Sequence, residues 1–148
     1  MRMISDVPLG AFLSGGVDSS ITAAAMARLG GEVKTFCLGF EESRFDESGY
    51  AREVARRLGT EHHETRDSLS SLESLVPLLD RLGEPFADES LLATYLLSKF
   101  TRQHVTVALS GDGGDELFAG YKRYAHLARA AKIRNLGMVH PWLTISRA

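Results

Sequence analysis

Short β-forming runs alternate with helical segments along most of this chain, and that alternation restricts the fold more than any other feature. Predicted strands cover residues 9–13, 33–40, 61–65 and 105–109. Residues at helical spacing predict helices over 18–29, 47–58, 68–82 and 91–103, and a last helix from Asp115. Strands separated by helices form βαβ units, so we expect an α/β fold with a parallel sheet and helices on both faces. Ligands of such sheets bind at the carboxyl ends of the strands.

Four of the predicted helices carry specific expectations. In the first, the apolar stripe expected to face the sheet consists of Ile21, Ala24, Ala25 and Leu29. Pro77 lies inside 68–82, and proline interrupts the helical hydrogen bonds, so we expect a kink or two short helices there. The last helix is expected to be continuous, with one stripe formed by Leu117, Tyr121, Tyr124 and Ala128. Asp46 and Glu47 are interpreted in part as caps of the helix over 47–58.

Length and composition exclude several classes of protein. The 148 residues suit one compact domain. A net charge of −2 gives no general attraction to nucleic acid or to an anionic membrane, so neither is an expected partner. No apolar run approaches the roughly 20 residues of a membrane span. Cys37 is the one cysteine, so no intramolecular disulfide can form, and we expect a buried core residue in a cytoplasmic protein.

The first glycine-rich turn lies between a predicted strand and a predicted helix, and it reads Ser14-Gly15-Gly16-Val17-Asp18-Ser19-Ser20. Two glycines allow the backbone to turn sharply and to approach an anion without interference from Cβ atoms. The free N–H groups and the dipole of the following helix then favour that anion. The serines add hydroxyl donors, and Asp18 is a candidate ligand for the Mg²⁺ that accompanies a nucleotide.

Two familiar phosphate-binding and dinucleotide-binding motifs are excluded. Gly10 and Gly15 have the Walker A spacing, but no Lys-[Ser/Thr] pair follows Gly15. After Gly111 and Gly113, the pattern Gly-x-Gly-x-x-Gly requires a glycine where Glu116 stands. The remaining alternative is an ordinary Gly-Gly turn in which one polar residue serves as a helix N-cap.

The second glycine-rich turn follows the last predicted strand and reads Ser110-Gly111-Asp112-Gly113-Gly114-Asp115-Glu116. Its three carboxylates lie within five residues and repel one another unless a cation is nearby. Next to a pyrophosphate site, the natural cation is Mg²⁺. The alternative is a solvated acidic turn that caps the following helix.

The pattern Ser-Gly-Gly-x-Asp-Ser at residues 14–19 resembles the PP-loop of the N-type ATP pyrophosphatases. These enzymes cleave ATP between its α- and β-phosphates and hold the leaving pyrophosphate. Together, the two turns resemble the synthetase domain of asparagine synthetases and their relatives. Further segments that fit this resemblance are 6–14, 45–48, 50–51, 59–64, 84–88 and 94–98. The resemblance covers about residues 7–124 and implies a Rossmann-like, adenine nucleotide α-hydrolase-like PP-loop domain.

The resemblance also implies a reaction and a set of site residues. In that family, ATP adenylates the side chain of aspartate to β-aspartyl-AMP with release of pyrophosphate, and ammonia then displaces AMP to give asparagine. The positions that would hold pyrophosphate are Ser14, Gly15, Gly16, Ser19 and Ser20. The positions around adenine and ribose are Leu13, Leu38, Ser110 and Gly111, partly through backbone atoms. Asp18 and Asp115 are the implied Mg²⁺ ligands, and Asp112 matches an acidic position linked to formation of the intermediate, where many relatives have glutamate.

The resemblance further predicts how this chain relates to a longer enzyme. We expect residues 1–131 to form the PP-loop core and 132–148 to form the tail of a truncated domain. The chain opens with Met1-Arg2-Met3, so the N-terminal glutaminase domain with its cysteine nucleophile is expected to be absent from this chain and present in the full-length protein. Later helices of the family, with a lysine that stabilises the transition state, are expected beyond Ala148. A homodimer is left open.

Several alternatives remain at this point. Other PP-loop ligases include β-lactam-forming synthetases, argininosuccinate synthase, GMP synthetase and tRNA-modifying enzymes, and the second turn favours the asparagine and β-lactam branch. A different class of hypothesis is an ATP-binding fragment without catalysis, and another is a folded scaffold without a ligand.

Overall fold

The computed structural model describes residues 3–67, 72–84, 88 and 90–135. Two compact units, Met1–Asp112 and Gly113–Ala148, divide the chain and are described separately. The expected boundary between residues 131 and 132 stays a prediction. In the part of the chain that the structure describes, no helix is long and apolar enough to cross a membrane.

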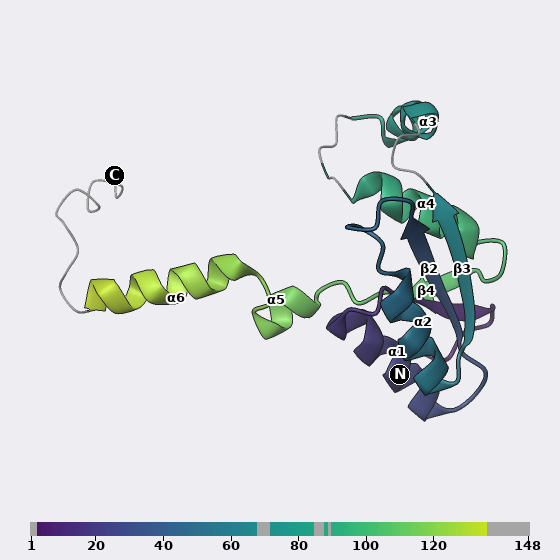
Figure 1. The fold of residues 1–148 in the computed structure, drawn as a ribbon, viewed down its shortest axis with the longest axis horizontal. Coiled ribbons are helices and arrows are strands. Elements are labelled where there is room, and N and C mark those ends of the chain that lie inside the picture. Colours follow the sequence, from purple (N-terminus) through teal and green to yellow (C-terminus); the bar gives the residue numbers. More distant parts are fainter. Residues whose placement is uncertain (1–2, 68–71, 85–87, 89, 136–148) are drawn as a thin grey trace. The chain divides into compact units, whose positions relative to one another are not determined.

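The first unit is built on a parallel four-stranded sheet, which confirms the predicted fold class (Figure 1). Its strands are β1 (Leu9–Phe12), β2 (Lys34–Phe40), β3 (Glu61–Asp67) and β4 (Val107–Leu109). Their order across the sheet is β3-β2-β1-β4. The register pairs Ala11 with Thr35 and with Leu109, so β1 lies in the middle of the sheet.

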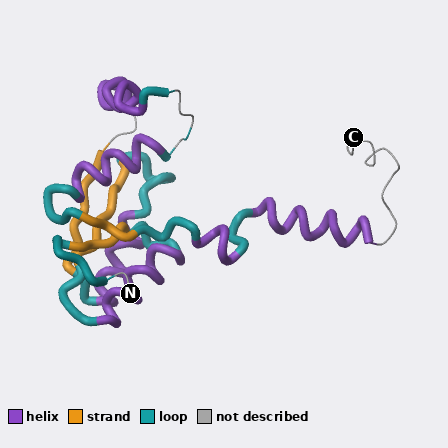
Figure 2. The backbone as a smooth tube through the Cα atoms, turned by 180° about the vertical axis from the view of Figure 1, so that it is seen from behind, coloured by secondary structure: helices purple, strands orange, loops and turns teal. Residues whose placement is uncertain are grey.

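Helices cover both faces of this sheet, as the sequence predicts (Figures 1 and 2). They are α1 (Val17–Leu29), α2 (Ser48–Leu58), α3 (Leu72–Leu82) and α4 (Leu91–Thr101). α1 and α2 pack on one face, α4 packs on the other, and α3 packs against α4. α3 continues through Pro77, so the alternative of two short helices is wrong. The expected start of that helix at Ser68 lies outside the described residues.

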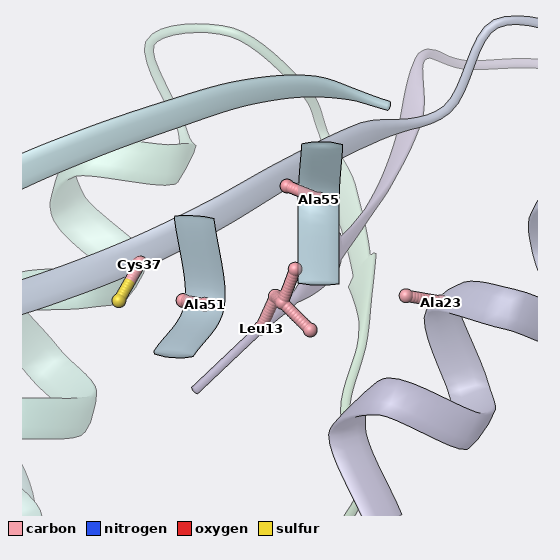
Figure 3. Close-up of a cluster of buried hydrophobic side chains, with 5 residues drawn as sticks. All are labelled: Leu13, Ala23, Cys37, Ala51 and Ala55. Atoms are coloured by element: carbon pink, nitrogen blue, oxygen red, sulfur yellow. The ribbon is translucent and has the colours of Figure 1, made fainter. Parts of the chain in front are cut away.

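The two faces of the sheet have different cores. On the α1–α2 face, small residues allow the helices to approach the strands closely, and the buried cluster consists of Leu13, Ala23, Cys37, Ala51 and Ala55 (Figure 3). On the α4 face, Phe36 is 0% exposed and its ring stacks on His63 at 5.2 Å between centroids. Phe100 of α4 and His104 complete this aromatic cluster.

The face of α1 that packs on the sheet differs from the predicted one. Ile21 is 57% exposed and Leu29 is 59% exposed, whereas Ala23 and Met26 are buried. The core beneath α1 has little room, so it accepts Ala23 beside Leu13, and Met26 packs in a separate cluster with Ala11. Ile21 and Leu29, together with Val17, therefore lie on the outer side of the helix.

The expected burial of Cys37 is confirmed, and it leads to a prediction about reactivity. Burial, together with the nearby carboxylate of Glu64, raises the pKa of the Cys37 thiol to about 12. Since the thiolate is the reactive form, we expect no measurable labelling of the native protein by a thiol reagent at pH 8 and full labelling after denaturation. Mass spectrometry after timed exposure to iodoacetamide measures this. Rapid labelling of the native protein would contradict the burial of this strand.

The described part of the second unit, residues 113–135, contains two helices rather than the single continuous helix that the sequence predicts. α5 (Gly114–Phe118) ends before α6 (Lys122–Asn135) begins. Ala119 between them has a left-handed φ of 58°, and the Gly120 N–H donates to the carbonyl of Asp115 at 3.0 Å. A side chain at Gly120 would collide with the Asp115 carboxylate. The glycine therefore permits the break that apolar spacing alone does not predict.

Candidate functional site

The strand order places a topological switch point between β1 and β4. From β1 the chain continues to β2 and β3 on one side, and β4 then pairs with β1 on the other side. Ligands of open parallel sheets bind in the crevice outside the carboxyl ends of strands at such a point. Both glycine-rich turns begin there, since Ser14 follows β1 closely and Ser110 follows β4 directly.

The first turn has the geometry of an open phosphate-binding loop. Gly15 has a left-handed φ of 86°, which favours glycine. The hydroxyls of Ser14 and Ser19 lie 3.0 Å apart and hydrogen-bond each other across the loop. The Gly16 N–H donates to Ser14 Oγ at 3.2 Å, and Ser19 Oγ donates to the Gly16 carbonyl at 3.2 Å. These bonds fix the shape of the loop from within.

The helix after this loop presents uncapped backbone donors. Gly16 is the N-cap of α1 and provides no side-chain cap hydrogen bond. The first bond inside the helix runs from the Ser20 N–H to the Gly16 carbonyl at 3.0 Å. The N–H groups of the preceding positions, residues 17–19, therefore have no acceptor within the helix. Such a terminus favours an anion through both its donors and its dipole.

The start of the second turn, at Ser110 and Gly111, lies directly against the first turn. A Cβ atom at Gly111 would lie 2.7 Å from the Ser19 nitrogen and 2.9 Å from the Asp18 carbonyl carbon. The Thr22 hydroxyl connects the two turns, because it lies 3.1 Å from the Asp18 carbonyl oxygen and 3.4 Å from the Ser110 carbonyl oxygen. Two turns that are 91 residues apart, counted from Ser19 to Ser110, thus form one surface.

The predicted acidic residues fall in both units. Asp112 belongs to the first unit, where its Oδ2 accepts a hydrogen bond from Ser110 Oγ at 2.8 Å. Asp18 lies in the first turn of α1, and its carboxylate is partly exposed. Asp115 belongs to the second unit, in the first turn of α5. The structure therefore brings Asp18 and Asp112 to one edge of the sheet, and the role of Asp115 stays a prediction.

Three predicted nucleotide-binding residues are buried to different degrees. The Leu13 side chain is in the core of the α1–α2 face, so only its backbone can meet a ligand. Leu38 is 9% exposed near the carboxyl end of β2. The Ser20 hydroxyl is buried and has no hydrogen-bond partner among the described residues. An unpaired buried hydroxyl is costly, which is consistent with a partner being supplied by a ligand or by a small shift of the loop.

These features fit a nucleotide phosphate and its magnesium ion. The loop has uncapped N–H donors and an unpaired serine hydroxyl. Glycines on both sides of it, Gly15 and Gly111, allow neighbouring backbone to pack closely. Mg²⁺ bound with a nucleotide keeps several waters and takes only one or two carboxylates from the protein. Asp18 suits that requirement. Among the described residues, there is no cluster of three or more metal-binding side chains that would hold an ion without the nucleotide.

Two contributors to this surface have no functional signal in the sequence. Thr22 resembles any other helical position, although its hydroxyl connects both turns. Tyr50 and Ala51 of α2 pack closely against the loop, because a Cβ atom at Gly15 would lie 2.5 Å from Tyr50 Cβ and 2.6 Å from the Ala51 nitrogen. Close backbone packing of this kind leaves no periodic signal in the sequence.

A separate cavity of about 340 Å³ lies beside the edge strand β4. Its lining comes from the ends of β1 and α4 and from residues 105–108, and it includes Phe12, Thr101 and Arg102. None of the predicted site residues lines this cavity. The glycine-rich edge of the sheet is therefore the candidate site.

Comparisons with known proteins agree with this geometry. The asparagine synthase family model matches residues 1–144. A putative asparagine synthetase (glutamine-hydrolyzing) 2 from Methanocaldococcus jannaschii is 42% identical over 139 residues, which is 92% of this chain and 27% of that protein. Asparagine synthetase (glutamine-hydrolyzing) 1 from Bacillus subtilis is 41% identical over 125 residues, 84% of this chain and 20% of that protein.

Solved structures support the fold. An NH3-dependent NAD synthetase from Campylobacter jejuni superimposes with a TM-score of 0.51 at 20% identity, covering 79% of this chain and 52% of that one. An NMN synthetase from Francisella tularensis gives a TM-score of 0.51 at 18% identity, covering 77% of this chain and 49% of that one.

The parallel sheet, its switch point and the helices on both faces define a Rossmann-like α/β fold, which the two solved structures share. Within that class, the chain belongs to the asparagine synthase family. The chain spans about a quarter of the length of the M. jannaschii relative and a fifth of the B. subtilis one.

Proposed function

We propose that this chain is the ATP-binding core of an asparagine-forming synthetase, in which ATP adenylates the aspartate side chain and ammonia then displaces AMP. The observation that carries the proposal is the meeting of the two glycine-rich turns, where Gly111 lies against Ser19 at the uncapped start of α1. Membership in the asparagine synthase family supports the choice of this reaction over that of other PP-loop ligases.

The reaction follows from charge and position. A carboxylate oxygen of aspartate attacks the α-phosphorus, the bond from that phosphorus to the bridging oxygen breaks, and pyrophosphate leaves with the electron pair. The N–H groups at the start of α1 and the hydroxyls of Ser14 and Ser19 hold the leaving group and stabilise its charge. Asp18 and Asp115 would hold Mg²⁺, which would supply further neutralisation of the same charge.

The second half of the reaction releases AMP. The nitrogen of ammonia attacks the activated carbonyl, a proton is lost, and AMP leaves to give the amide. We propose that Asp112 assists formation of the intermediate, and that Leu13, Leu38, Ser110 and Gly111 surround the nucleotide through backbone and apolar contacts. The named activity of the relatives, glutamine hydrolysis coupled to asparagine synthesis, suggests a glutaminase domain in the full-length protein as the source of ammonia.

The test is exchange of labelled pyrophosphate into ATP with Mg²⁺, with and without aspartate and without ammonia. We expect binding of Mg-ATP by the chain and aspartate-dependent exchange by the full-length protein. Asp18→Ala removes a charged ligand of the metal–phosphate group, so we expect Mg-ATP binding to weaken on the order of tenfold to a hundredfold. Isothermal titration measures the binding.

Glu32→Ala is the matched control, since it removes an exposed carboxylate that precedes β2, at the opposite edge of the sheet. Equal losses of Mg-ATP affinity in Glu32→Ala and Asp18→Ala would contradict a specific site at Asp18. Binding without exchange in the full-length protein would identify a nucleotide-binding module, and exchange that depends on a carboxylate other than aspartate would indicate a β-lactam-type or other ligase. A folded chain without Mg-ATP binding would rule out the proposed site.

A further inference from the structure

The phosphate loop rests on the first turn of α2. A Cβ atom at Gly15 would lie 2.5–2.6 Å from the Cβ and carbonyl carbon of Tyr50 and from the Ala51 nitrogen. Because of this contact, the loop cannot move closer to α2 unless α2 itself shifts. Ala51 is 0% exposed and packs in the same core cluster as Leu13, the residue just before the loop. The position of the loop therefore depends on the position of this helical turn.

The first turn of α2 is held by a residue outside the helix. Glu47 is the N-cap of α2 and makes no side-chain cap hydrogen bond. Asp46 supplies the missing acceptor, because its Oδ1 accepts a hydrogen bond from the Ser48 N–H at 3.1 Å. The Ser48 hydroxyl, the Ser48 N–H and the Phe40 N–H hold the pKa of the Asp46 carboxyl below its ordinary value, and the charge of Arg66 adds to this effect.

The surroundings of Asp46 connect it to the carboxyl edge of the sheet. Gly39 near the end of β2 allows the approach, since a Cβ atom there would lie 3.1 Å from Asp46 Oδ1. Arg66 of β3 lies 3.5 Å from the other carboxylate oxygen. Ser48 is 1% exposed, so its bond to Asp46 is shielded from water. One carboxylate thus contacts the ends of two strands and caps the start of the helix that packs against the phosphate loop.

We propose that Asp46 is a positioning residue for the phosphate loop, acting through the first turn of α2 on Gly15. The inference rests on the proposed function in one respect, namely that Mg-ATP is the ligand whose binding Asp46 favours. Asp46 touches no reacting atom in this scheme. Its contribution is to keep the backbone donors of the loop in the arrangement that an anion requires.

The experiment compares Asp46→Ala with Asp46→Asn in the full chain. Asparagine keeps an acceptor for the Ser48 N–H, whereas alanine removes it. In ligand-free protein, we expect Asp46→Ala to accelerate hydrogen exchange of the Ser14, Gly16 and Ser20 amides about tenfold, the effect of losing one helix cap, with exchange at residues 35–37 in the middle of β2 unchanged. Affinity for Mg-ATP should fall by a similar factor, and Asp46→Asn should restore most of both properties.

Glu53→Ala is the matched control. Glu53 is also a carboxylate of the α2 region with two arginine partners, Arg56 and Arg57, but it lies on the exposed side of the helix. We expect this variant to leave loop exchange and nucleotide affinity unchanged. If Asp46→Ala does not fold, Ser48→Ala removes only the hydroxyl that bonds Asp46 and should accelerate exchange at the same amides by a smaller factor.

Three results would overturn the proposal. The first is a hydrogen-exchange rate of the loop amides in Asp46→Ala that equals the wild-type rate. If Asp46→Ala does not fold, the same result in Ser48→Ala counts in its place. The second is an equal effect in Glu53→Ala, and the third is an Asp46→Asn variant as impaired as Asp46→Ala, which would assign the effect to the Arg66 ion pair. If the wild-type chain fails to bind Mg-ATP, the proposed function fails, and the exchange measurement still decides the role of Asp46.

Discussion

Gly15→Ala is expected to lower the free energy of unfolding by about 2–6 kcal/mol, through backbone strain and overpacking together. Gly15 has a φ of 86°, a conformation that alanine adopts only with strain, and its new Cβ atom would lie 2.5 Å from Tyr50 Cβ. The loop cannot relieve the contact without moving its N–H donors. We therefore expect Mg-ATP binding to weaken on the order of a hundredfold, which corresponds to about 2.8 kcal/mol.

Gly49→Ala provides the control for this substitution. Gly49 lies in the first turn of α2, its φ is not left-handed, and a Cβ atom there would meet nothing within 4 Å. Alanine favours helix over glycine by about 0.5–1 kcal/mol, so this variant should be equally stable or slightly more stable. Urea denaturation measures both stabilities, and isothermal titration measures both affinities. Similar stability and affinity in Gly15→Ala and Gly49→Ala would contradict the packing of the loop on α2.

The order and type of most elements could be predicted because strand and helix patterns differ in period. β2, α2 and α4 lie close to their predicted ranges, and Gly59 ends α2 in a left-handed conformation. The packed face of α1 could not be predicted in the same way. Its many small residues give no clear stripe, and the close approach of the sheet selects Ala23 rather than Ile21. Which residues of this helix are buried depends on how closely each part of it approaches the sheet, since Met26 is buried as well.

The location of the site could also be predicted from topology, but its supporting residues could not. Two glycine-rich strand exits in a parallel sheet must lie at the same edge, and the contact of Gly111 with Ser19 follows this expectation. The connection through Thr22 and the support beneath Gly15 depend on the exact separation of α1, α2 and β4. The break between α5 and α6 depends on the left-handed conformation of Ala119 and on the absence of a side chain at Gly120, and the apolar spacing reflects neither.

Phe36→Ala is expected to produce the largest loss of stability in the sheet, about 3–5 kcal/mol, because it removes a fully buried aromatic ring and leaves a cavity. The ring is 0% exposed and contacts His63 by stacking and Phe100 edge-on at 6.2 Å. Gly10 of β1 lies directly beside it, since a Cβ atom there would be 2.6 Å from the Phe36 ring. A glycine neighbour has no side chain with which to fill the space.

Phe45→Ala is the matched control for this loss. Phe45 is 45% exposed in the β2–α2 connection, and Arg44 lies over its ring at 4.4 Å. An exposed cation–π contact contributes about 0.5–1 kcal/mol, so this variant should lose far less stability. A natural domain is stable by only about 5–15 kcal/mol, so Phe36→Ala is expected to remove a large fraction of the total and to lower the denaturation midpoint strongly. Equal midpoints for the two variants would mean that the α4 face of the sheet is not a packed core.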